Sequence, residues 1–123
     1  MAPDRQTTIL LAEEEELFRI PFLALLQKNG YNTIVAVDGP DALAKAKEYE
    51  GEIHLLLSNI LMPAMTGIDL AAQLLIERPR MRILLMSTTD QRMFRLDHDW
   101  QFLSKPFGFQ TLKLKIQGIL TSS

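Results

Sequence analysis

The chain alternates short apolar runs with longer segments whose apolar residues recur at helical spacing. This alternation predicts an α/β fold, in which parallel strands form one sheet and helices cover both of its faces. We expect strands near 8–12, 32–36, 53–58, 82–86 and 101–104, and helices near 15–29, 39–49, 67–77, 90–95 and 108–120. Right-handed connections favour a doubly wound five-stranded sheet of order 2-1-3-4-5. Little chain separates the last two strands, so the fourth helix should have one or two turns at most.

Length and composition predict a single domain over residues 1–123, with its core at about 7–120. The hydrophobic share of 47% and the charged share of 23% are typical of a globular protein. No cysteine is present, which excludes disulfides, thiolate catalysis and most structural zinc sites. The apolar runs are too short to span a bilayer and the first residues do not resemble a secretory signal, so we expect a cytoplasmic protein without a membrane partner.

Positive charge is concentrated toward the end of the chain. Residues 78–123 contain 8 Lys or Arg and 3 Asp or Glu, whereas residues 1–77 contain 5 and 12. The arginines of the second part lack the interleaved aromatic residues and the helix-turn-helix pattern of a nucleic-acid interface. They are Arg78, Arg80, Arg82, Arg92 and Arg95. We therefore expect a solvated surface that faces protein partners, with no direct contact to nucleic acid.

Polar side chains follow or end four of the five expected strands. In an open parallel sheet, the carboxyl ends of the strands line the crevice in which ligands bind. The polar residues at these ends are Glu13 to Glu16, Ser58 and Asn59, Ser87 and Thr88, and Lys105. The predicted strand order changes direction between the first and third strands, so Glu13 and Asn59 should flank the crevice.

This arrangement resembles the receiver domain of two-component response regulators, and the resemblance covers nearly the whole chain. The family pattern is an acidic pair after the first strand, Asp-x-x-Met-Pro-x-Met-x-Gly after the third, Ser or Thr after the fourth, and Lys-Pro after the fifth. The matching residues here are Glu13 and Glu14, Asn59 with Met62, Pro63, Met65 and Gly67, Ser87, and Lys105 with Pro106. The resemblance implies a flavodoxin-like fold and a role in phosphorelay signalling rather than an enzyme.

The resemblance also implies a Mg²⁺ site. Its ligands would be Glu13, Glu14, Asn59 and the backbone carbonyl of Leu61. Mg²⁺ requires near-ideal octahedral geometry, and Glu14 is one methylene longer than the Asp usual in the family. Asn59 adds no charge to the ion. We therefore expect these two residues to weaken Mg²⁺ binding.

Asn59 stands at the position of the phosphoaccepting Asp of the family. A carboxylate can attack a phosphoryl group, whereas a neutral amide is no such nucleophile, so the chain should not be phosphorylated at this residue. The resemblance assigns Ser87 and Lys105 to the phosphoryl oxygens, Ser87 and Phe102 to the conformational switch, and a cis peptide bond to Pro106. Thr88 replaces a residue that is usually Gly or Ala and should narrow the approach to the pocket.

Three functions remain open at this point. The first is a receiver domain whose phosphoacceptor has been replaced, with a histidine kinase or phosphotransfer protein as its partner. The second is a phosphorylation-independent pseudo-receiver, a protein-interaction module that contacts a kinase, an output domain or its own copy through the fourth and fifth helices. The third is a flavodoxin-like carrier of FMN, although the four carboxylates of Glu13 to Glu16 would repel its phosphate.

Overall fold

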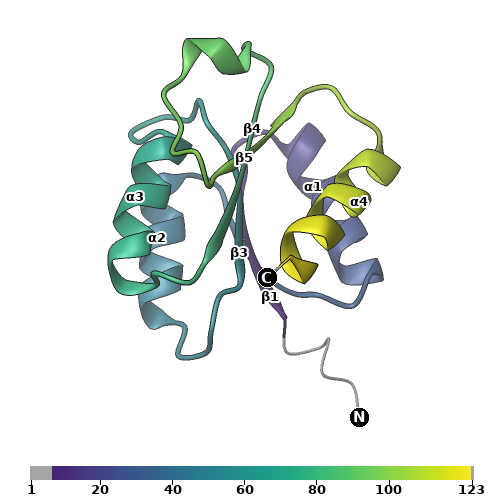
Figure 1. Cartoon of the computed structure of the whole chain (residues 1–123). Helices are drawn as coiled ribbons and strands as arrows, with labels where there is room; N and C mark the ends of the chain where they lie inside the picture. Colours follow the sequence, from purple (N-terminus) through teal and green to yellow (C-terminus); the bar gives the residue numbers. More distant parts are fainter. Residues whose placement is uncertain (1–6, 123) are drawn as a thin grey trace.

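The computed structural model describes residues 7–122. Five parallel strands form one sheet in the order β2-β1-β3-β4-β5 (Figure 1). The elements are β1 (Thr8–Ala12), α1 (Glu16–Lys28), β2 (Asn32–Ala36), α2 (Gly39–Glu48), β3 (Leu55–Asn59), α3 (Gly67–Glu77), β4 (Arg82–Ser87), the 3₁₀ turn η2 (Gln91–Met93), β5 (Gln101–Ser104) and α4 (Phe109–Thr121). The predicted doubly wound α/β fold and its strand order are confirmed.

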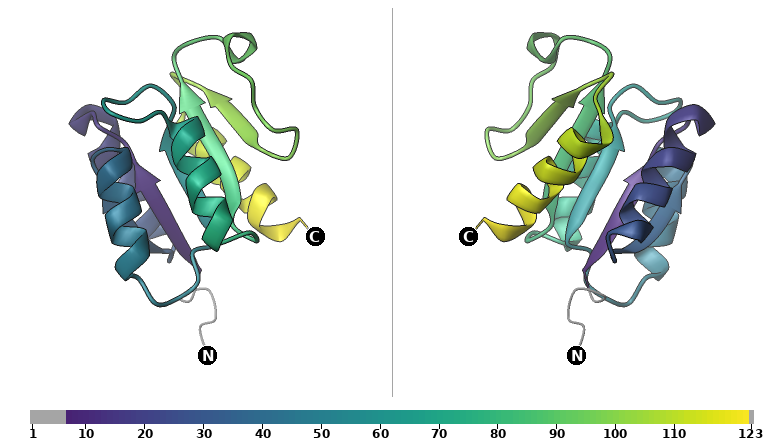
Figure 2. Two further views of the ribbon diagram at one scale, coloured as in Figure 1. Left: turned by 90° about the vertical axis from the view of Figure 1, so that its left-hand side faces the viewer. Right: turned by 90° about the vertical axis from the view of Figure 1, so that its right-hand side faces the viewer.

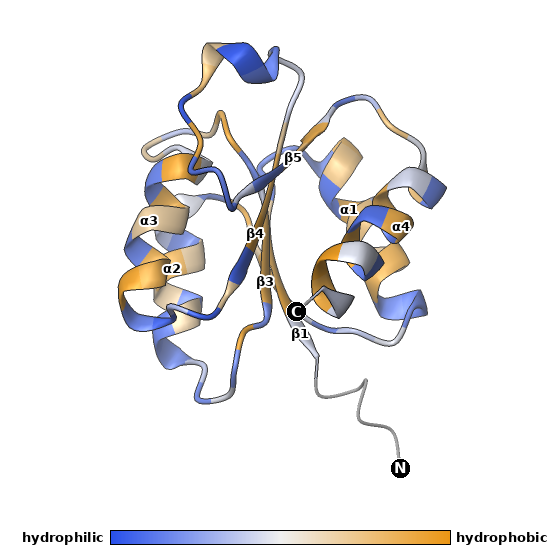
Figure 3. Ribbon diagram, viewed as in Figure 1, coloured by the Kyte–Doolittle hydropathy of each residue, from blue (hydrophilic) through white to orange (hydrophobic). Residues whose placement is uncertain are grey.

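The sheet separates two hydrophobic cores. Helices α2 and α3 pack on one face of the sheet and helices α1 and α4 on the other (Figure 1). Successive strand residues point to opposite faces, so Leu10 and Leu56 lie in the α2/α3 core while Leu11 and Leu57 lie in the α1/α4 core. Strands β3 and β4 are largely apolar along their length in Figure 3. Because the strands are buried on both faces of the sheet, their sequences are continuous apolar runs.

Local hydrogen bonds set the starts of two helices at the predicted places. The side chain of Asp38 accepts a hydrogen bond from the backbone N–H of Asp41 at 2.8 Å, which caps α2. Thr66 caps α3 in the same way through its hydroxyl, at 3.1 Å from the N–H of Asp69.

Helix α1 contains Pro21 and continues through it. None of the described helices is long and apolar enough to cross a membrane.

The segment between β4 and β5 is even less helical than predicted. The expected fourth helix near 90–95 is a single 3₁₀ turn, η2, which lies beyond the carboxyl ends of the strands (Figure 2). The chain then runs without regular structure to β5, and its side chains Phe94, Leu96 and Trp100 pack against the α2/α3 core. Phe94 and Leu96 are only two residues apart, so one face of a helix could not carry all three of these side chains.

The third strand is displaced relative to the prediction. We expected it near 53–58, but β3 spans Leu55–Asn59. His54 instead accepts a hydrogen bond from the backbone N–H of Thr8 through Nδ1, at 3.0 Å. As a result, Asn59 is the last residue of the strand, paired in register with Met86 of β4, rather than the first residue of the following loop.

Candidate functional site

Four of the predicted site residues are buried at the carboxyl end of the sheet. Glu13 follows β1, Asn59 ends β3, Ser87 ends β4 and Lys105 follows β5, with exposed fractions of 0%, 7%, 2% and 6%. Buried polar groups are costly unless they are hydrogen-bonded. Among the described residues, every buried side-chain nitrogen and oxygen atom has such a partner. The buried polar atoms of the site are therefore satisfied within the protein itself.

Lys105 lies at the centre of the site. Its Nζ donates to Oε1 of Glu13 at 2.6 Å and to Oδ1 of Asn59 at 3.1 Å. The ammonium also lies 4.0 Å from the centroid of the Phe18 ring. A buried ammonium is stable only when opposite charge and acceptors surround it, and here a carboxylate, an amide oxygen and an aromatic face do so. Lys105 thus forms a buried ion pair with Glu13.

Asn59 bridges Lys105 and the loop after β3. Its Nδ2 donates to the backbone carbonyl of Leu61 at 2.8 Å, while its Oδ1 accepts from Lys105. The first residue of α3, Gly67, packs directly against this turn. A Cβ at Gly67 would lie 2.3 Å from the carbonyl oxygen of Asn59, so only glycine allows this close approach.

The acidic loop after β1 is held by an arginine that the sequence analysis did not single out. Nη1 of Arg19 donates to the backbone carbonyls of Glu13 and Glu14 at 3.0 and 2.9 Å. The backbone N–H of Glu15 donates to Oε2 of Glu13 at 3.1 Å. The carboxylate of Glu14 is exposed, unlike that of Glu13. A basic residue one turn into the helix that follows an acidic run was the signal for Arg19.

Among the described residues, no hydrogen bond joins Ser87 and Phe102, the two predicted switch residues. Oγ of Ser87 accepts from the backbone N–H of Thr89 at 3.0 Å. Thr88 is exposed, and Phe102 is half-buried against the α2/α3 core. The peptide bond between Lys105 and Pro106 is cis, as the resemblance implied.

The predicted Mg²⁺ ligands do not fit that ion in this arrangement. Both carboxylate oxygens of Glu13 accept hydrogen bonds, one of them from an ammonium, and Oδ1 of Asn59 accepts from the same ammonium. The carbonyl of Leu61 faces an N–H donor. Glu14 is the one predicted carboxylate that remains exposed to solvent. Mg²⁺ needs oxygen lone pairs that converge on one point, and three of the four predicted ligands direct theirs at protein donors.

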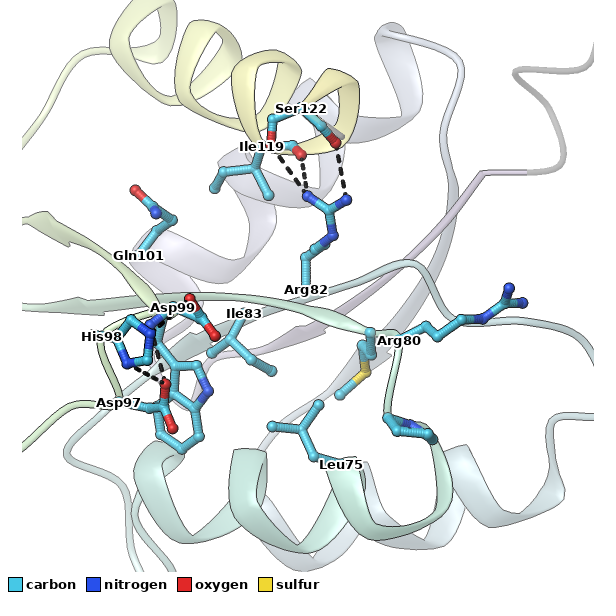
Figure 4. Close-up of a pocket in the computed structure, with 13 residues that line it drawn as sticks. Leu75, Arg80, Arg82, Ile83, Asp97, His98, Asp99, Gln101, Ile119 and Ser122 are labelled. Atoms are coloured by element: carbon cyan, nitrogen blue, oxygen red, sulfur yellow. Dashed lines mark hydrogen bonds and ion pairs between the residues drawn. The ribbon is translucent and has the colours of Figure 1, made fainter.

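Two of the hollows in the described part of the chain lie at opposite ends of the strands. The smaller, of about 210 Å³, adjoins the site and is lined by Lys105 and by apolar side chains that include Leu17, Phe18 and Phe109. The larger, of about 720 Å³, lies at the amino ends of β4 and β5 (Figure 4). There the guanidinium of Arg82 donates to the carbonyl of Ile119 in α4 and to that of Ser122, the residue after α4. The larger hollow contains none of the predicted site residues.

Comparison with known proteins identifies the family. Residues 9–117 match the family described as response regulator receiver domain. The sensor kinase CckA of Brucella abortus is 30% identical over 117 residues, which cover 92% of this chain and 12% of that protein. The chain spans about half of the length of several other curated relatives.

Solved structures agree with this assignment. The chemotaxis protein CheY4 of Vibrio cholerae matches with a TM-score of 0.82 and 26% identity, over 94% of this chain and 99% of that one. The response regulator TrrA of Thermotoga maritima, solved in complex with Mg²⁺-BeF, matches with a TM-score of 0.78 and 26% identity, over 93% of this chain and 99% of that one. Because the family match covers most of the sequence, the chain belongs to the response regulator receiver domain family of two-component signalling systems.

Proposed function

We propose that this domain is a receiver that does not accept a phosphoryl group at residue 59 and acts as a phosphorylation-independent docking module. The amide of Asn59 carries the proposal. It is buried at the carboxyl end of β3 and lies 3.1 Å from the ammonium of Lys105, where the resemblance places the phosphoacceptor. A carboxylate there would be a nucleophile, whereas an amide is not.

The other polar residues support the same proposal. In a phosphorylated receiver, a lysine and a hydroxyl would bind the phosphoryl oxygens through charge-assisted hydrogen bonds. Here Lys105 is paired with Glu13, and Oγ of Ser87 accepts from the backbone of its own loop. The domain has no covalent step of its own under this proposal, so we expect no enzymatic turnover. The predicted weakening of Mg²⁺ binding by Glu14 and Asn59 belongs to the same proposal.

Exposed apolar side chains next to the site favour docking of a protein partner. Leu17 and Ile20 on α1 are 86% and 59% exposed, and Phe109 at the start of α4 is 53% exposed. Leu17 and Phe109 line the hollow beside Lys105. Apolar side chains grouped around a hollow are typical of a protein-interaction surface. Receiver domains interact with histidine kinases or phosphotransfer proteins, and we propose such a protein as the partner.

The proposal does not include direct binding of nucleic acid. Arg78 donates to the backbone carbonyls of Ala46, Tyr49 and Gly51, and Arg82 donates to the end of α4. These two guanidinium groups support the fold instead of forming an open basic surface for phosphates. An output domain, a second copy bound through η2 and α4, and a cytoplasmic location remain further parts of the proposal.

Intact mass after incubation with Mg²⁺ and acetyl phosphate tests the proposal. The wild type should keep its mass, and Asn59→Asp should gain one phosphoryl group. Asn29→Asp is the matched control, because Nδ2 of Asn29 also donates to a backbone carbonyl at 2.8 Å but lies at the end of α1. A phosphoryl group on the wild type would refute the proposal. If Asn59→Asp also stays unmodified, Glu14 and Thr88 disable the pocket as well, and the docking module alone remains.

A further inference from the structure

We infer that the side-chain amide of Asn59 takes the place of the divalent cation, so that this receiver pocket is complete without Mg²⁺. The inference rests on the proposed function and extends it to the chemistry of the pocket. Its central observation is the hydrogen bond from Nδ2 of Asn59 to the carbonyl of Leu61, the carbonyl that was predicted to hold the ion. An N–H donor therefore occupies the side of that oxygen that faces Asn59.

The orientation of this amide is fixed at both ends. The ammonium of Lys105 can only donate hydrogen bonds, so the atom of Asn59 that faces it at 3.1 Å must be the oxygen. The nitrogen then points to the Leu61 carbonyl. A flipped amide would bring two donors together at Lys105 and two acceptors together at Leu61, and both contacts would be repulsive. The hydrogen-bond network thus allows one orientation.

Lys105 is itself held in place. Its ammonium is 2.6 Å from Glu13 and 4.0 Å from the centroid of the Phe18 ring, and the side chains of Lys105 and Glu13 are 2% and 0% exposed. A change in the ammonium position would leave the Glu13 carboxylate buried without its charge partner, which is strongly unfavourable. Glu13 therefore fixes Lys105, and Lys105 fixes the amide of Asn59.

Further donors neutralise the acidic loop. Arg19 donates to the carbonyls of Glu13 and Glu14, and the N–H of Glu15 occupies the second carboxylate oxygen of Glu13. The N–H of Glu15 thus donates to a carboxylate oxygen that a cation would use, and Arg19 adds positive charge at the neighbouring backbone carbonyls. A divalent ion that entered would have to displace several of them, and Glu14 is the one predicted carboxylate still open to solvent.

The variant Asn59→Ala distinguishes a block of the pocket by the amide from a simple lack of negative charge at residue 59. If Asn59 weakens cation binding only because it lacks a negative charge, Asn59→Ala should bind a cation no better than the wild type, because alanine removes an oxygen ligand. If the amide blocks the pocket, Asn59→Ala should bind better than the wild type, because the Leu61 carbonyl becomes free. Asn59→Asp should bind best, since it removes the donor and adds a charge.

Mn²⁺ binding, measured by the electron paramagnetic resonance signal of the free ion, tests this order. We expect no binding by the wild type or by the Asn29→Asp control at millimolar Mn²⁺. The dissociation constant of Asn59→Asp for Mn²⁺ should be at least about tenfold below the highest Mn²⁺ concentration at which the wild type shows no binding. Asn59→Ala should lie between the two. Wild-type affinity equal to that of Asn59→Asp, or Asn59→Ala binding no better than the wild type, would overturn the inference.

A second measurement uses the wild-type protein alone and serves if Asn59→Ala does not fold. The side-chain NH₂ resonances of Asn59 in a ¹H–¹⁵N spectrum should stay unchanged when Mg²⁺ is added, and a shift that saturates with Mg²⁺ would contradict the inference. The acetyl phosphate experiment distinguishes the two proposals. Phosphorylation of the wild type refutes the proposed function, whereas cation binding without phosphorylation refutes only the amide block.

Discussion

Replacement of Lys105 by methionine should destabilise the domain strongly. Methionine keeps most of the side-chain volume, but it removes the ammonium that lies over the Phe18 ring and 2.6 Å from the fully buried carboxylate of Glu13. Removal of one partner from a buried ion pair costs about 3–5 kcal/mol. Glu13 keeps the hydrogen bond from the N–H of Glu15, so we expect a value near the lower end, about 3 kcal/mol.

Urea denaturation followed by circular dichroism measures this loss. With a slope of about 1.5 kcal/mol per molar urea, a loss of about 3 kcal/mol lowers the midpoint by about 2 M. Lys45→Met is the matched control, because the pair of Lys45 with Asp41 is partly exposed and should contribute less than about 1 kcal/mol. The double variant Glu13→Gln, Lys105→Met should recover part of the loss. The reasoning is wrong if Lys105→Met costs no more than Lys45→Met.

Two further predictions concern backbone fit and pH. Gly67→Ala should destabilise the domain by at least about 2 kcal/mol in thermal or urea unfolding, because its Cβ would lie 2.3 Å from the last carbonyl of β3. Gly118 lies in α4, and a Cβ there would have no atom within 4 Å, so Gly118→Ala should stabilise the domain by about 0.5–1 kcal/mol. Equal effects of the two substitutions would contradict the packing described for Gly67. Partial burial acts to raise the pKa of Asp41, but the backbone N–H of Val37 and the side chain of Lys45 outweigh it and hold that pKa below its ordinary value. The folded state therefore binds the Asp41 proton less tightly than the unfolded state does. The stabilisation by this carboxylate is present above the pKa of Asp41 in the unfolded state, and it is lost as the pH falls through the lower pKa of the folded state. Carboxyl ¹³C chemical shifts in an NMR titration should place its midpoint below that of an exposed aspartate, and a midpoint above it would contradict this account.

The positions of most elements followed from the sequence because each rests on a local pattern, and the strand order followed from the right-handed connections between parallel strands. Apolar runs mark strands that are buried on both faces, and Asp38 and Thr66 mark helix starts by the hydrogen bonds that their side chains accept. The meeting of Glu13, Asn59 and Lys105 was also predictable, since the carboxyl ends of parallel strands share one edge of the sheet.

The hydrogen bonds inside the site did not follow from the sequence. Residue spacing does not indicate that Lys105 approaches Glu13 more closely than Asn59, or that the amide nitrogen of Asn59 faces Leu61. Those facts depend on side-chain distances between separate strands. The acceptors of Arg19 were missed for a different reason: they are backbone carbonyls, and the position of Arg19 one turn into the helix after the acidic run was the signal that could have indicated them.

The irregular segment before β5 limits how this domain can change shape. A helix can shift over a sheet as one rigid body, because its backbone hydrogen bonds are internal and travel with it. The segment that replaces the fourth helix has no such ladder, and its side chains Phe94, Leu96 and Trp100 each reach the α2/α3 core. To slide, it would have to withdraw three separate anchors. The surface above β4 and β5 is therefore attached to the fold at three separate points, and a partner that binds there contacts an irregular segment instead of a helix.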